Sequence, residues 1–116
     1  MTDNFNELEL AIFEWFKNTY ANSQLAAQIE STRFLSREWT GVGFYVHFEI
    51  SQEIEPIDLD DFAGHWPING PNLASDDIEH GGGSMIWGVD GYIDCIEMYA
   101  HGDFFNETVN GFEVSL

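Results

Sequence analysis

The side chains best suited to chemistry lie on an alternating stretch near the middle of the chain. Tyr45, His47 and Glu49 occupy every second position of residues 42–50, so in a β-strand they share one face. A histidine beside a carboxylate and a phenol is suited to acid–base chemistry. No oriented nucleophile accompanies them, and a solvent-facing row is the simpler interpretation. The trio therefore predicts a pocket edge only if that face is covered.

A second group of polar side chains lies in the acidic segment 51–82, which also holds His65 and His80. Clustered carboxylates favour hard cations or a basic partner. The run from Asp58 to Asp61 lacks the glycine and the distal glutamate of a helix–loop–helix calcium site. We therefore expect no metal and no cofactor. The candidate partner-binding residues of this segment are Asp58, Asp60, Asp61, Trp66, Asp76 and Asp77.

Cys95 is the sole cysteine, and Asp94 precedes it in an apolar, strand-like stretch. Burial and nearby carboxylates both raise the pKa of a thiol, whereas a nucleophilic thiolate needs a positive environment. Asp94 and Glu97 are three residues apart, so a regular strand places them on opposite faces. Without a bulge they cannot form an acid–base pair. The sequence thus favours binding over catalysis and predicts no catalytic residue. The alternative is a small-ligand pocket protein or a weak enzyme that uses the face of Tyr45, His47 and Glu49.

The charge balance is the most unusual property of the chain. Three basic residues stand against 21 acidic ones, which gives a net charge of −18. From Glu38 onward there are 16 carboxylates and no lysine or arginine. These carboxylates are solvated, for solubility alone, or bind a cation, or face a basic protein. Direct nucleic-acid binding is disfavoured because it needs cationic groups on phosphates.

The elements that must position these residues follow from periodicity. Residues 4–20 carry an amphipathic helical stripe, with Asn4 and Glu7 at capping spacing. A second helix runs from Asn22 or Ser23 to about residue 31, with Leu25 and Ile29 inward. Residues 42–50 alternate as a half-buried strand does. Further strands are expected at 33–39, in a hairpin at 84–99 that turns at Asp90-Gly91, and near 111–116.

Together these elements predict one α+β domain over residues 1–116, with two N-terminal helices packed on an antiparallel sheet of four or five strands. The alternative is a cone of helix and curved sheet, with a ligand pocket between helices and sheet. The broad apolar surface of residues 4–20 also suggests a homodimer. With one cysteine, no signal sequence and no apolar run long enough for a bilayer, we expect a cytoplasmic protein that does not enter membranes.

The hairpin carries the one resemblance to known proteins. Its stretch Met85-Ile86-Trp87 and the following Asp90-Gly91-Tyr92-Ile93-Asp94-Cys95-Ile96-Glu97 resemble a hairpin of small acidic bacterial proteins of unassigned function. Some proteins of this kind resemble immunity proteins of bacterial toxin systems. The resemblance implies a non-catalytic inhibitor that binds a basic toxin, such as a nuclease. It implies no role for individual residues.

Overall fold

The computed structural model describes residues 4–40, 43–51, 53–62, 64–75, 78–100 and 112–115. Two helices open the chain, α1 (Glu7–Thr19) and α2 (Ser23–Glu30). The strands are β1 (Arg33–Trp39), β2 (Gly43–Glu49), β3 (Ile68–Asn69), β4 (Asn72–Ser75), β5 (Ile78–Val89), β6 (Tyr92–Ala100) and β7 (Phe112–Ser115), with a short 3-10 helix η1 (Leu59–Phe62) before β3.

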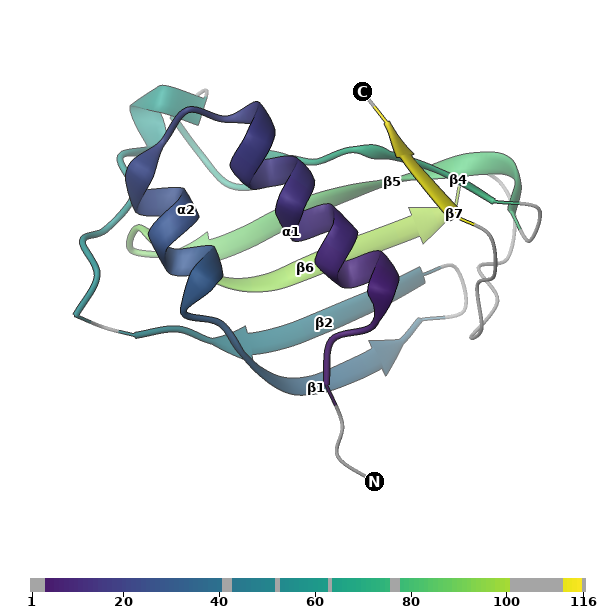
Figure 1. Ribbon diagram of the computed structural model, residues 1–116, viewed down its shortest axis with the longest axis horizontal. Coiled ribbons are helices and arrows are strands. Elements are labelled where there is room, and N and C mark those ends of the chain that lie inside the picture. Colours follow the sequence, from purple (N-terminus) through teal and green to yellow (C-terminus); the bar gives the residue numbers. More distant parts are fainter. Residues whose placement is uncertain are drawn as a thin grey trace.

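The two helices lie side by side over one face of an antiparallel sheet (Figure 1). The strand order is β1-β2-β6-β5-β4-β7, and β3 pairs with β5 outside this path. The predicted α+β architecture is confirmed. The sheet is larger than the expected four or five strands, because the segment 51–82 contributes β3, β4 and the start of β5. Neither helix in the described part of the chain has the length and apolar character to cross a bilayer.

Helix α1 begins later than its sequence suggests. Asn6 accepts a hydrogen bond from the Glu9 amide at 2.9 Å, and Glu9 Oε1 accepts one from the Asn6 amide at 2.8 Å. This capping box replaces the expected pairing of Asn4 with Glu7. The reason is tertiary: Phe5 leaves the helix and packs edge-on against Phe13, with ring centroids 5.1 Å apart.

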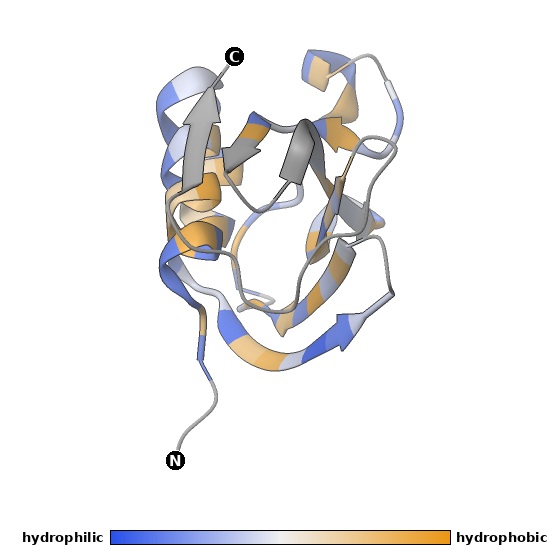
Figure 2. Cartoon of the chain, turned by 90° about the vertical axis from the view of Figure 1, so that its right-hand side faces the viewer, coloured by the Kyte–Doolittle hydropathy of each residue, from blue (hydrophilic) through white to orange (hydrophobic). Residues whose placement is uncertain are grey.

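The hydrophobic stripe of α1 faces the sheet. Figure 2 shows the hydrophobic side of the helix turned inward and its hydrophilic side turned to solvent. Ile12 and Phe16 are completely buried, while Leu10 keeps 50% of its surface exposed. Most of the apolar surface that suggested a homodimer is therefore covered within the chain.

Helix α2 follows the prediction closely. Asn22 caps it by accepting a hydrogen bond from the Leu25 amide, and Leu25 and Ile29 are both buried. Its unexpected feature is Gln28, which is also fully buried. The Gln28 amide donates to the carbonyls of Glu55 and Gly91 and accepts from the Ile93 amide, at 3.0 to 3.1 Å. Gln28 thus makes hydrogen bonds to the backbone at the start of β6 that a neighbouring strand would otherwise make.

The alternation predicted for residues 42–50 is confirmed in β2. Phe44, Val46 and Phe48 are buried in the core under the helices, whereas Tyr45 and His47 are only half-buried. Val42, which the prediction placed in the same row, lies outside the described residues. Because successive side chains of a strand point to opposite faces, Tyr45 and His47 lie on the sheet face that the helices leave open.

The predicted hairpin is confirmed as β5 and β6, joined at Asp90-Gly91. Both turn residues have positive φ, 55° for Asp90 and 88° for Gly91, as a tight two-residue turn requires. The ladder slips once, because Trp87 pairs with Cys95 while Gly88 pairs with Ile93. Asp94 is therefore an extra residue on β6, which makes the strand locally bulged.

Candidate functional site

The open face of the sheet is the candidate site. In the strand register, Tyr45 of β2 lies between Glu38 of β1 and Glu97 of β6, and the next pair on this face is His47 with Cys95. Trp87 of β5 lies opposite Cys95. We define the outer-face cluster as Glu38, Tyr45, His47, Trp87, Asp94, Cys95 and Glu97.

The bulge decides which acidic groups belong to this cluster. In a regular strand Asp94 and Glu97 would lie on opposite faces, as the sequence predicted. The extra residue changes this, because Ile93 and Ile96 are both buried in the core although they are three residues apart. Asp94 and Glu97 consequently both lie away from the core.

Direct contacts hold the cluster in a defined arrangement. The Trp87 indole Nε1 donates a hydrogen bond to Glu97 Oε1 at 3.0 Å. His47 Nε2 lies 3.3 Å from Glu38 Oε1. The rings of Tyr45 and His47 are stacked, with centroids 6.4 Å apart. These contacts fix the aromatic rings and carboxylates relative to one another, so the surface is pre-arranged rather than formed on binding.

The charge of the outer-face cluster is predominantly negative. Glu97, followed by burial and by Cys95 and Glu38, raises the pKa of Tyr45 above its ordinary value. Burial raises the pKa of Asp94, an effect that the neighbouring His47 partly opposes. The cluster therefore presents negative charge that the protein itself leaves largely uncompensated.

The lysines and arginines of the chain are all engaged elsewhere. Lys17 pairs with Glu14 and Glu30 on the helices, and Arg37 binds Glu9 under the N-terminus of α1. Arg33 forms an ion pair with Glu49 at the margin of the sheet. These three are the only lysine and arginine residues of the sequence, so none of them neutralises the outer-face cluster.

The surroundings of Cys95 disfavour a reactive thiol. Cys95 is buried. Burial first, then Asp94 and Glu97, raises the pKa of its thiol to about 12. A nucleophilic cysteine needs the opposite shift, so Cys95 is a small buried residue of the outer face and not a nucleophile.

We expect Cys95 to be nearly inert in the folded protein. At pH 8 its thiolate fraction is about a thousandfold below that of a thiol with a pKa of 9.0. Its reaction with 5,5′-dithiobis(2-nitrobenzoate) should therefore be slow in native buffer and fast in guanidinium chloride. Because the folded protein holds this proton more tightly, stability should fall as pH rises from about 9 toward 12. Comparable native and denatured reaction rates would contradict this assignment.

The acidic residues that the sequence singled out and the structure describes lie in and just before η1, not on the strands that carry this cluster. Asp58 Oδ1 accepts a hydrogen bond from the Asp60 amide at the start of η1, and Asp61 accepts one from Asn22 at 3.0 Å. Asp58, Asp60 and Asp61 are exposed, whereas Trp66 is half-buried against the core. Asp76 and Asp77 lie outside the described residues. Within the described ranges, no three histidine, cysteine or acidic side chains are grouped as metal ligands.

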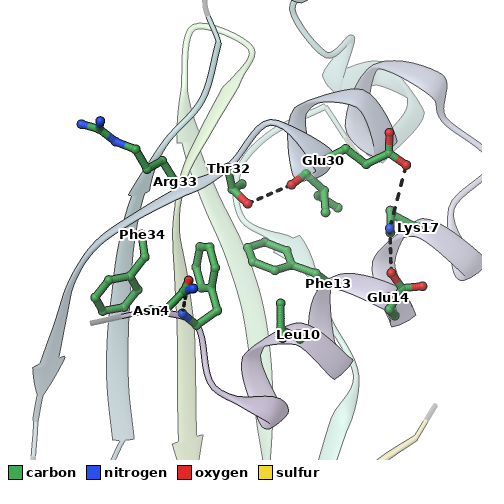
Figure 3. Close-up of a pocket in the computed structure, with 11 residues that line it drawn as sticks. Asn4, Leu10, Phe13, Glu14, Lys17, Glu30, Thr32, Arg33 and Phe34 are labelled. Atoms are coloured by element: carbon green, nitrogen blue, oxygen red, sulfur yellow. Dashed lines mark hydrogen bonds and ion pairs between the residues drawn. The ribbon is translucent and has the colours of Figure 1, made fainter. Parts of the chain in front are cut away.

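A hollow of about 500 Å³ lies between the helices and β1 (Figure 3). Leu10, Phe13 and Phe34 surround it, and Lys17 links Glu14 to Glu30 along one side. We call it the helix-side hollow. Its lining comprises Asn4, Phe5, Leu10, Phe13, Glu14, Lys17, Ile29, Glu30, Thr32, Arg33 and Phe34.

The residues predicted to form a pocket edge, Tyr45, His47 and Glu49, do not line the helix-side hollow. Tyr45 and His47 lie on the opposite face of the sheet, because Phe44 and Val46 take the positions under the helices. Glu49 lines a different hollow.

That second hollow, of about 380 Å³, lies where β2 and β6 separate. Their pairing ends at His47 and Cys95, next to the bulged Asp94. Beyond this point the two strands are no longer hydrogen-bonded to each other. The lining of this end hollow comprises Phe48, Glu49, Ile50, Val89, Asp90, Tyr92, Ile93 and Asp94. No local pattern in the sequence predicts this end hollow, since the bulge depends on how β5 and β6 pair.

Comparison with known proteins adds no further constraint on this site. No protein-family model matches the chain, and no curated protein or solved structure matches it significantly.

Proposed function

We propose that this protein is a non-catalytic binding protein whose outer-face cluster docks a basic protein. One observation carries the proposal. The carboxylates of Glu38 and Glu97 lie beside the rings of Tyr45 and Trp87 on one open sheet face. Asp94 lies near His47 of the same cluster, and every lysine and arginine of the chain is engaged elsewhere.

The physical roles of the two residue types differ. Uncompensated carboxylates attract a basic partner from a distance and raise its rate of association. Aromatic rings supply contact area at a low cost in conformational entropy. Trp87 keeps 37% of its surface exposed while its indole is held by Glu97. A pre-positioned, half-exposed tryptophan among carboxylates favours a protein surface as partner over a small anion or a nucleic acid.

The hairpin resemblance fits this role. The stretch similar to small acidic, immunity-like bacterial proteins is β5 with β6, and it supplies Trp87, Asp94 and Glu97 to the cluster. In this proposal the partner is a basic toxin, such as a nuclease, which the protein would inhibit by covering a cationic surface.

Affinity capture from the native host at low and high salt tests the proposal. The immobilised protein should retain a basic partner at low salt and release it at high salt. The double variant Glu38→Gln/Glu97→Gln should lose that partner. Glu7→Gln/Glu30→Gln is the matched control, because it removes the same number of charges from exposed helix positions. Equal capture by both variants would remove the outer face from the proposal.

A second candidate function, binding of a small apolar ligand, is favoured by the volume and aromatic lining of the helix-side hollow. The neutral dye N-phenyl-1-naphthylamine should then fluoresce in the presence of the protein. Leu10→Glu should abolish the signal, and His47→Ala should leave it unchanged, because His47 lies on the other face of the sheet. A signal insensitive to Leu10→Glu would dismiss this candidate.

A further inference from the structure

The end hollow has a structural origin that keeps it open. The first residues of β6, before Cys95, are not paired with β2. On this side, hydrogen bonds from the helix layer hold them instead. The buried Gln28 side chain binds the Ile93 amide and the Gly91 carbonyl. The Ile57 amide also donates to Gly91 at 2.8 Å. The hairpin end is therefore fixed without help from residues 48–50 of the neighbouring chain segment.

The lining combines two kinds of surface. Phe48 and Ile93 are buried and form its apolar part, while Val89 is 61% exposed. The exposed carboxylates of Glu49, Asp90 and Asp94 complete it. An exposed valine beside three carboxylates suits a ligand that is apolar along its length and cationic at its end.

The charges around the end hollow indicate that a ligand would bring a cationic group to it. Arg33 pairs with Glu49, so one of the three carboxylates already holds a guanidinium. Lys17 and Arg37 are engaged with other carboxylates, which leaves Asp90 and Asp94 without a lysine or arginine partner from this chain. Burial raises the pKa of Asp94, so its charged form is incompletely compensated.

We infer that the end hollow receives an arginine side chain of the basic partner, with the aliphatic stem on Val89 and the guanidinium paired with Asp94. Arginine suits the site better than lysine, because its planar guanidinium is more weakly hydrated and binds carboxylates through two parallel hydrogen bonds. The end hollow adjoins the outer-face cluster through Asp94, so one partner can cover both. This inference rests on the proposed function, since the arginine belongs to that partner.

A titration of the ¹⁵N-labelled protein with N-acetyl-arginine amide tests the site directly. The amide signals of Val89, Tyr92 and Ile93 should shift saturably, with a Kd on the order of 1 mM for so small a ligand. The capped citrulline analogue has the same shape without the charge and should bind about fivefold more weakly. Equal shifts with both probes, or shifts outside the hollow, would overturn the inference.

Variants separate this inference from the proposed function. Asp90→Asn/Asp94→Asn should weaken arginine binding about fivefold or more, and asparagine tolerates the positive φ of residue 90. If this variant fails to fold, the comparison of arginine with citrulline on the unmodified protein still decides. Glu38→Gln/Glu97→Gln should leave arginine binding unchanged.

Affinity capture with the same variants distinguishes a failure of this inference from a failure of the proposed function. If Asp90→Asn/Asp94→Asn retains the basic partner as well as the unmodified protein does, while Glu38→Gln/Glu97→Gln loses it, the inference is wrong and the proposed function stands. If capped arginine binds in the hollow but Glu38→Gln/Glu97→Gln captures the partner normally, the outer-face proposal fails and the arginine site remains supported.

Discussion

Replacing Arg37 with alanine is expected to lower the free energy of unfolding by about 3–5 kcal/mol. The Glu9 carboxylate is completely buried, and Arg37 binds both of its oxygens, at 2.7 Å through Nε and at 2.6 Å through Nη2. The same Nη2 also donates to the Asn4 carbonyl at 3.0 Å. Removing the guanidinium leaves a buried charge without its cation. Urea denaturation followed by circular dichroism measures the loss.

Two further variants establish the cause of that loss. Arg33→Ala breaks an ion pair whose side chains are 75% and 50% exposed, so it should cost no more than about 1 kcal/mol. The double variant Arg37→Met/Glu9→Leu should recover most of the stability, because apolar residues replace a buried ion pair with little penalty. If the double variant is as unstable as Arg37→Ala, either the packing of Arg37 over the Phe34 ring or the lost hydrogen bond from the Asn6 amide to Glu9 explains the effect instead.

Replacing Gln28 with leucine is expected to cost about 2–4 kcal/mol. The side chain is fully buried and satisfies the Ile93 amide and the carbonyls of Gly91 and Glu55. Leucine fills a similar volume but cannot pair with these backbone groups, and a buried polar group without a partner is costly. Thermal or urea denaturation measures the change.

Gln24→Leu is the matched control, because Gln24 lies one turn earlier on α2 and its side-chain oxygen accepts only from Ser23, at 3.4 Å. Its effect should stay within about 0.5 kcal/mol. Gln28→Glu offers a further check, since it keeps the shape but loses the donor and buries a charge. It should be more destabilising at neutral than at acidic pH, where the carboxyl is protonated. Equal losses for Gln24→Leu and Gln28→Leu would show that the hydrogen bonds contribute little.

These two residues also hold elements that carry the proposed binding surfaces. Gln28 fixes the hairpin end that borders the end hollow, and Arg37 ties α1 to β1, the strand that carries Glu38. Variants that loosen either contact are therefore expected to disturb partner binding indirectly.

Local sequence determined the elements whose signals come from near neighbours. The cap at Asn22, the alternation through Phe44 and Val46 and the turn at Asp90-Gly91 each depend on residues within a few positions. The helices, β1, β2 and the hairpin were predicted for that reason. Short β3 and β4 were missed, because two to four residues of mixed polarity carry little periodic signal.

Tertiary structure decided the features that depend on distant partners. Asn4 and Asn6 both have a glutamate three residues later, and the packing of Phe5 selected Asn6 as the cap. The bulge at Asp94 depends on how β6 pairs with β5. The sequence by itself determined the excess of carboxylates and the polar face of β2. Only the strand order brings Glu38 and Glu97 beside Tyr45, because lateral neighbours in a sheet are set by chain topology and not by local pattern.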